Sequence, residues 1–271
     1  MIALILGLVF PVVYVLGKDY LNDTIIERKD IEKLTHFPII GQINHSNKET
    51  NMVVGSFPKS SISESFRSMR TNIQYLTKGK DSNVIMVTSD MVGAGKTFIS
   101  INLASVYAQY DKKTILLGFD LRKAKIYQDF NLSNDVGLTS YLIGDNELDE
   151  IIQPSGKLKH LDIIMAGPVP PNPAELIASD RTKTLIEELR KKYDYIIIDT
   201  PPIGLVTDAY LLMDHSDVNL FIVRQRYTNK KVFGSIIKEI EDRGMKMSIA
   251  VNDIATSGVY GYQYGYGRGY G

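Results

Sequence analysis

VIMVTSDMVGAGKTF, residues 84–98, runs from an apolar strand through a glycine-containing loop into a helix. This order is typical of a phosphate-binding loop, in which backbone N–H groups turn toward phosphate oxygens and the helix start adds its positive dipole end. In such loops the Lys of the closing Gly-Lys-Thr reaches the terminal phosphates, and the Thr hydroxyl can bind magnesium. The stretch therefore predicts binding of ATP or GTP, and a chance Gly-Lys-Thr at a turn is the alternative. The residues expected to contact the nucleotide are Val92, Gly93, Ala94, Gly95, Lys96, Thr97 and Phe98.

The loop departs from the usual pattern at one position. That pattern has a glycine five residues before the glycine that precedes the lysine, and Asp90 stands there instead. Gly93 and Gly95 still supply flexible backbone nearest the phosphates.

Apolar, β-branched-rich runs recur along the rest of the chain, with helical patterns between most of them. The expected strands are 84–88, 114–117, 161–165, 195–199, 219–223 and 248–251. Strands joined by crossover helices form a mostly parallel sheet with helices on both faces. We therefore predict an α/β fold with a mostly parallel, doubly wound sheet.

Two carboxylates follow predicted strands. Asp199 ends the strand YIIID, and Asp120 follows the strand TILL. In parallel α/β sheets ligands bind beyond the carboxyl ends of the strands, where the phosphate loop also lies. Asp199 has the arrangement of a Walker B carboxylate that holds magnesium together with Thr97, and a helix cap is the alternative. Asp120 could complete the magnesium shell or accept a proton from an incoming hydroxyl, and the sequence leaves both roles open.

Composition excludes several classes of function. The chain has 271 residues and 44% hydrophobic content, enough for one main domain with appendages. Basic and acidic residues both number 31, so no global field indicates a nucleic-acid partner. The absence of Cys excludes disulfides, thiol catalysis and Cys-based zinc sites, and the four His show no metal-ligand spacing.

The chain divides into four predicted parts. Residues 1–17 carry no charge and are predicted to be part of a transmembrane helix, although a full span needs about 20 residues; a buried helix and a secretory signal are the alternatives. Residues 18–59 are predicted to be a juxtamembrane linker, with a charged helix before a loop that begins at Pro38. Residues 60–258 are the predicted P-loop domain, which opens with an amphipathic helix. Residues 259–271 are a tyrosine- and glycine-rich tail, predicted to be flexible.

Three motifs together resemble those of one family. GAGKT, ILLGFDLRK and YIIIDTPP are similar to the Walker A, Walker A′ and Walker B motifs of the bacterial tyrosine kinases, the cytoplasmic halves of polysaccharide co-polymerases. GPVPPNPAEL (167–176), TDA (207–209) and the tyrosine-rich end match as well, so the resemblance covers most of 37–271. It implies a P-loop NTPase fold of the ParA/MinD-like architecture and an ATP- and Mg²⁺-dependent protein tyrosine kinase. The implied catalytic residues are Lys96, Asp120 and Asp199, and the implied magnesium ligands are Thr97, Asp120 and Asp199.

The resemblance also implies a setting. The kinase domain would face the cytoplasm at a bacterial inner membrane, form a homo-oligomeric ring and regulate polysaccharide polymerisation and export. Its implied partners are a membrane adaptor segment of the same or a neighbouring chain, the polysaccharide export machinery and a protein tyrosine phosphatase. Arg122 and Asn252 are further expected nucleotide contacts, although an Asn that closes a strand turn is equally ordinary.

Two sequence features outside the Walker motifs bear on this reading. The tail tyrosines are plausible phosphoacceptors, namely Tyr260, Tyr262, Tyr264, Tyr266 and Tyr270; the alternative is a low-complexity tail that stacks on RNA or saccharide. Glu64, Arg67 and Arg70 resemble the family's Glu-x-x-Arg-x-x-Arg oligomerisation motif, and a simple surface charge pair is the alternative.

Departures from the family pattern leave two rival functions open. Gly118 replaces the first of two Walker A′ aspartates, and Ala124 replaces a proline. Met91 stands where ParA/MinD-type ATPases carry a signature lysine, which favours the kinase. The rivals are a ParA/MinD-like ATPase and a nucleotide-binding scaffold that has lost transfer activity with Gly118.

Overall fold

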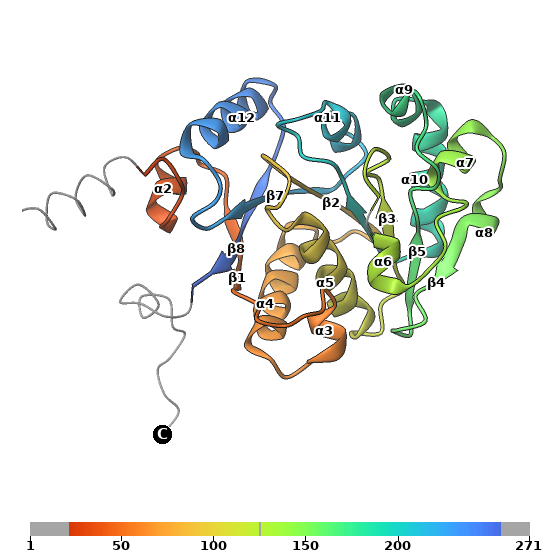
Figure 1. Ribbon diagram of the computed structural model, residues 1–271, viewed down its shortest axis with the longest axis horizontal. Helices are drawn as coiled ribbons and strands as arrows, with labels where there is room; N and C mark the ends of the chain where they lie inside the picture. The colour runs from red at the N-terminus through yellow and green to blue at the C-terminus, as the bar shows by residue number, and fades with distance from the viewer. Residues whose placement is uncertain (1–21, 125, 256–271) are drawn as a thin grey trace, which may run out of the picture.

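A computed structural model describes residues 22–124 and 126–255, and it contains an eight-stranded sheet in the order β1-β8-β7-β2-β6-β3-β5-β4 (Figure 1). All neighbouring strands are parallel except β4 and β5. The strands are β1 (Ile39–Asn44), β2 (Asn83–Ser89), β3 (Thr114–Gly118), β4 (Ile152–Pro154), β5 (Leu161–Ile164), β6 (Tyr195–Asp199), β7 (Val218–Arg224) and β8 (Ser248–Ile254). The six predicted strands and the mostly parallel sheet are confirmed.

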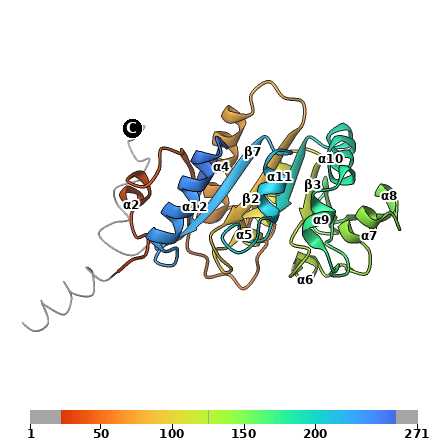
Figure 2. The same ribbon diagram turned by 90° about the horizontal axis from the view of Figure 1, so that it is seen from above.

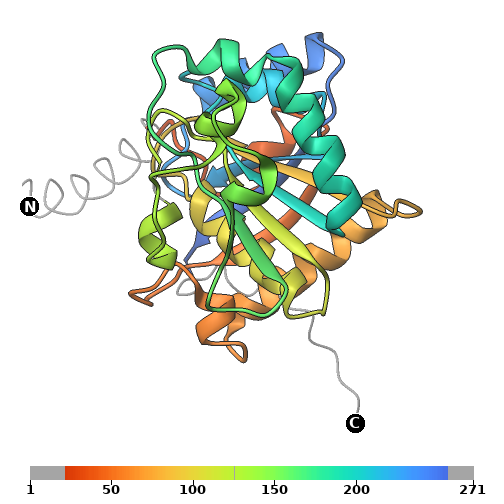
Figure 3. The same cartoon turned by 90° about the vertical axis from the view of Figure 1, so that its right-hand side faces the viewer.

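Helices cover both faces of this sheet, as a doubly wound fold requires. On one face lie α3 (Val53–Ser56), α4 (Ser61–Leu76), α5 (Lys96–Ala108) and α6 (Ile126–Phe130). On the other face lie α2 (Arg28–Glu32), α7 (Leu138–Ile143), α8 (Leu148–Ile151), α9 (Pro173–Ile177), α10 (Asp180–Lys192), α11 (Asp208–Met213) and α12 (Lys230–Asp242). Figures 2 and 3 show the sheet between these two layers.

The sheet divides the core into two hydrophobic clusters, and the central strand β2 shows how. Every residue of β2 is buried. Val84 and Met86 belong to the cluster under α10 to α12, whereas Ile85 and Val87 belong to the cluster under α4 and α5. A strand buried on both faces reads as a continuous apolar run, which is why the sequence around the phosphate loop identifies it.

The helix predicted from Ser60 is α4, and Ser60 caps it by accepting a hydrogen bond from the Ser63 amide at 3.2 Å. Phe66, Met69 and Ile73 form its buried face, as their spacing predicts.

The predicted loop from Pro38 is wrong at its start, because Ile39–Asn44 form β1. This edge strand pairs with β8 and buries Ile40 and Ile43. Gly41 looked like a turn residue, but it lies inside the strand. Glycine fits there because a Cβ would come within 2.5 Å of Met69 Sδ.

The charged helix predicted before this loop is shorter than expected. In the part of this segment that the structure describes, from residue 22 on, only Arg28–Glu32 are helical, and Ile25 and Ile31 pack into the core. The range assigned to the linker thus contributes a strand and core side chains, while the domain boundaries themselves stay predictions.

The predicted membrane segment (1–17) and the tyrosine-rich tail lie outside the described residues. Within the described ranges, no helix combines the length and apolarity of a membrane span.

Candidate active site

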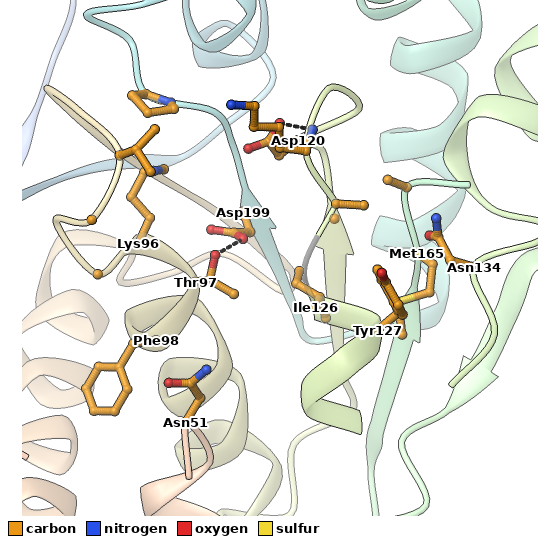
Figure 4. Close-up of a pocket in the computed structure, with 18 residues that line it drawn as sticks. Asn51, Lys96, Thr97, Phe98, Asp120, Ile126, Tyr127, Asn134, Met165 and Asp199 are labelled. Atoms are coloured by element: carbon orange, nitrogen blue, oxygen red, sulfur yellow. Dashed lines mark hydrogen bonds between the residues drawn. The ribbon is translucent and has the colours of Figure 1, made fainter. Parts of the chain in front are cut away.

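A cavity of about 230 Å³ opens at the carboxyl ends of β2, β3 and β6, where the sequence predicts the site (Figure 4). The predicted site residues that line it are Val92, Gly93, Gly95, Lys96, Thr97, Phe98, Asp120 and Asp199. The fold therefore brings the phosphate loop and both predicted carboxylates to one place.

The loop between β2 and α5 adopts a conformation that depends on its glycines. Gly93 and Gly95 have φ angles of 88° and 96°, in the left-handed region that side chains disfavour. The helix α5 begins at Lys96, so its unpaired amides and positive dipole end face the loop. This is the geometry of an anion-binding helix start.

Asp199 is buried at the end of β6 and accepts two hydroxyl hydrogen bonds. Thr97 Oγ1 donates to its Oδ2 at 2.8 Å, and Ser100 Oγ donates to its Oδ1 at 3.1 Å. Burial raises the pKa of Asp199 to about 6, against the opposing effect of the Lys96 charge and the two hydroxyls. A carboxylate that is costly to ionise without a cation, next to a hydroxyl oxygen, suits a magnesium ion.

Asp120 follows β3 and faces the same cavity. Its Oδ1 accepts the backbone N–H groups of Lys123 at 2.9 Å and Arg122 at 3.3 Å. Burial raises the pKa of Asp120, and these amides and the Lys96 charge oppose the rise. Both backbone bonds use Oδ1.

The loop after β3 is held by an ion pair that the sequence analysis missed. Arg122 Nε and Nη2 donate to the two carboxylate oxygens of Asp208 at 2.9 and 3.0 Å. Asp208 is fully buried at the start of α11. The TDA motif contained this residue, but no local pattern indicated its partner. Arg122 as a nucleotide contact stays a prediction.

Asn252, the predicted adenine contact, lies behind the phosphate loop. Its Nδ2 donates to the Ala94 carbonyl at 3.0 Å, and it lines a neighbouring hollow that shares Gly93, Gly95 and Phe98 with the cavity. Its contact with a base stays a prediction.

Several cavity residues were not identified as site residues from the sequence, namely Asn51, Tyr127, Asn134 and Met165. Asn134 is fixed by the backbone of Gly167, to which it donates at 2.9 Å and from which it accepts at 3.0 Å. Asn51 is fixed by the Asn102 side chain, which donates to its carbonyl at 2.6 Å. Long-range loop contacts of this kind leave no periodic pattern to read.

The three residues of the predicted oligomerisation motif lie on α4, away from the cavity. Glu64 pairs with Arg67, which also donates to the Pro58 carbonyl at 2.7 Å. The Arg70 guanidinium stacks over the Tyr110 ring, 4.2 Å from its centroid. Their role in an interface stays a prediction.

Within residues 22–124 and 126–255, no group of three or more His, Cys, Asp or Glu side chains could hold a metal ion. A magnesium ion would therefore need nucleotide oxygens to complete its shell, as is usual for this ion.

Comparison with known proteins identifies the family. A family model described as an AAA domain matches residues 82–250. The tyrosine-protein kinase YwqD of Bacillus subtilis is 40% identical over 186 residues, which are 69% of this chain and 78% of YwqD. A relative from Klebsiella pneumoniae, whose name gives a tyrosine-protein kinase in the cps region, is 36% identical over 184 residues. These residues are 68% of this chain but 25% of the relative.

Solved structures agree with the sequence relatives. The kinase domain of the Escherichia coli tyrosine kinase ETK superimposes with a TM-score of 0.80 at 30% identity, covering 89% of this chain and 100% of that domain. The MinD protein of Pyrococcus horikoshii, solved with Mg-ADP, is 20% identical with a TM-score of 0.51, covering 61% of this chain and 68% of that one; it shares the fold alone. The predicted ParA/MinD-like P-loop architecture is thus confirmed. By its matched length, its identity and its fold, this chain belongs to the bacterial tyrosine-protein kinases.

Proposed function

We propose that this chain uses Mg-ATP to phosphorylate tyrosines in the tail of a neighbouring copy, namely Tyr260, Tyr262, Tyr264, Tyr266 and Tyr270. The observation that carries the proposal is the convergence of the phosphate loop, Asp199 and Asp120 on one cavity. Two carboxylates with different surroundings suit two different tasks. Asp199 accepts from two hydroxyl groups beside the loop, and Asp120 accepts from two backbone amides on its Oδ1.

The residues divide the work of phosphoryl transfer as follows. Lys96 and the loop amides would hold the β- and γ-phosphates and neutralise their charge. Thr97 and Asp199 would hold a magnesium ion, with Asp120 as a further ligand or as the base. When bound, magnesium supplies positive charge that offsets the charge on the phosphates.

Asp120 as the base gives a balanced reaction. The tyrosine oxygen attacks the γ-phosphorus, its bond to phosphorus forms, and the bond from that phosphorus to the β-phosphate oxygen breaks. ADP leaves, and the phenolic proton passes to Asp120. The raised pKa of Asp120 makes its carboxylate a better proton acceptor than an exposed aspartate.

The proposed setting follows the family. Residues 1–17 would anchor the chain in a bacterial inner membrane, 18–59 would link the anchor to a cytoplasmic kinase domain at 60–258, and 259–271 would be the acceptor tail. Glu64, Arg67 and Arg70 would join copies into a ring, so that each tail reaches a neighbour's cavity. Added phosphate places about −1.5 to −2 charge on each tyrosine, which would repel tails within a ring and so regulate polysaccharide polymerisation and export. A membrane adaptor, the export machinery and a tyrosine phosphatase are the proposed partners.

The test is incubation of the purified chain with Mg-ATP, followed by mass-spectrometric mapping of phosphotyrosine. We expect phosphate on the tail of the unmodified protein and none in Lys96→Met. A mixture of Lys96→Met with a tail-deleted active chain tests transfer between copies, and phosphate should appear on the inactive copy. Release of free phosphate without phosphotyrosine would favour the ATPase, and ATP binding with neither product would favour the scaffold.

A further inference from the structure

Three consecutive carbonyl groups of the phosphate loop, those of residues 92–94, accept hydrogen bonds from side chains. The donors, in the same order, are the Tyr227 hydroxyl at 2.8 Å, Arg224 Nη1 at 2.8 Å and Asn252 Nδ2 at 3.0 Å. Arg224 ends β7, Tyr227 lies three residues later, and Asn252 lies in β8. We propose that these three side chains are positioning residues that fix the loop in its phosphate-binding conformation.

The geometry of the peptide unit explains how they would act. In a planar trans peptide the C=O of one residue and the N–H of the next point in opposite directions. Carbonyls held toward β7 and β8 therefore turn the amides of residues 93–95 the other way. The cavity that contains Lys96 and Asp199 is lined by Gly93 and Gly95 but by none of the three donors. Arg224 and Asn252 line a neighbouring hollow on the other side of the same two glycines. Because each carbonyl points to its donor, the amide that follows it points away from Tyr227, Arg224 or Asn252.

The supports fit directly against the glycines of the loop. A Cβ added to Gly93 would lie 2.8 Å from the Tyr227 hydroxyl oxygen, and one added to Gly95 would lie 2.2 Å from Asn252 Nδ2. Glycine at these positions therefore permits the close approach of the donors as well as the positive φ angles.

Arg224 is itself held in place from several sides. Its Nε donates to Asp253 Oδ2 at 2.8 Å, and its guanidinium stacks over the Tyr227 ring at 5.0 Å. Asp253 Oδ1 also meets His45 Nδ1 at 2.5 Å. Burial alone would raise the pKa of Asp253, but the bonds from His45 and Arg224 keep it below its usual value. The Arg224 guanidinium donates to Asp253 and to the Gly93 carbonyl from two different nitrogens. The single ammonium nitrogen of a lysine cannot reproduce this pair of hydrogen bonds.

This inference rests on the proposed nucleotide binding, and its test separates the two. Displacement of a fluorescent ADP analogue gives the affinity for Mg-ADP and for Mg-pyrophosphate, which meets the loop but has no base. Tyr227→Phe removes only the hydroxyl, and we expect it to weaken Mg-ADP binding by about threefold to tenfold, the effect of one hydrogen bond. Arg224→Lys should weaken it at least as much. Tyr110→Phe, at a residue 56% exposed beyond the far end of α5, is the matched control and should stay within about twofold.

The pyrophosphate measurement distinguishes positioning of the loop from a direct contact with adenine. We expect the affinity for pyrophosphate to fall by the same factor as that for ADP in Tyr227→Phe and Arg224→Lys. The melting temperature of nucleotide-free Tyr227→Phe should fall by no more than about 5 °C, the effect of one hydrogen bond. A loss confined to ADP, or affinities equal to those of Tyr110→Phe, would overturn the inference. If the unmodified chain binds neither ligand, the proposed function fails first, and the inference falls with it.

Discussion

Asp199→Asn should stabilise the nucleotide-free protein while it abolishes magnesium-dependent transfer. Asp199 is buried at the end of β6, and burial raises its pKa to about 6. In the unfolded chain the same carboxyl has the ordinary value of 3.8. The folded state therefore pays for an ionised carboxylate at neutral pH, and asparagine of the same shape carries no charge to desolvate.

The sign and size follow from the two pKa values. Because the folded pKa is the higher, the cost is absent below pH 4, grows between pH 4 and 6, and is complete above pH 6. A difference of roughly two pKa units corresponds to about 3 kcal/mol, an upper limit. Thr97 and Ser100 both donate to Asp199, so in the variant the hydroxyl facing the new NH₂ group must accept instead. We expect a net gain of about 1–3 kcal/mol, or roughly 3–10 °C in melting temperature.

Thermal unfolding from pH 4 to pH 8, with a chelator present, measures this effect. The melting temperatures of the two proteins should converge near pH 4 and separate as the pH rises to 6. Asp81→Asn is the matched control, because Asp81 is exposed and should show no such separation. A lower melting temperature of Asp199→Asn at pH 7.5, or a difference that does not depend on pH, would refute the reasoning.

Three further substitutions test other parts of the site. Asp120→Asn should slow phosphotyrosine formation by about 10²-fold or more in single-turnover assays, because asparagine cannot take the phenolic proton. The affinity for Mg-ADP should stay nearly unchanged, because the asparagine oxygen can still accept the two backbone amides. Arg122→Gln should lower the free energy of unfolding in urea by about 2–4 kcal/mol, because it leaves the buried Asp208 carboxylate unpaired. In the double variant, Asp208→Asn should restore most of this loss. Gly95→Ala should weaken Mg-ADP binding by at least about tenfold in titration. The new Cβ would clash with Asn252, and alanine is strained at a φ of 96°. An affinity within about twofold of that of the unmodified chain would contradict this.

The sequence predicted those parts of the fold that have local signals. The buried strands appear as apolar runs, and α4 appears as a helical period capped by Ser60. The carboxylates at the ends of β3 and β6 follow from the rule that parallel strands present their carboxyl ends at one edge. Each of these predictions rests on a pattern within one short stretch of sequence.

Features that depend on distant partners could not be predicted in this way. β1 contains Gly41, where the close approach of Met69 from α4 leaves no room for a Cβ. The Arg122–Asp208 pair joins residues that are far apart in the chain, and the Tyr227 hydroxyl reaches a carbonyl more than a hundred residues away. Composition and period contain no information about such contacts.

The aspartate that interrupts the loop's usual pattern also has a physical explanation. Asp90 lies outside the cavity lining and is absent from the residues with positive φ, so its position needs neither glycine's small size toward the phosphates nor its backbone freedom. Its side chain is buried, and Thr228 Oγ1 lies 3.4 Å from its Oδ1. Thr228 follows Tyr227 in the same segment that supports the loop carbonyls. Asp90 therefore links the start of the loop to the segment after β7, and the departure from the usual pattern does not touch the glycines at 93 and 95.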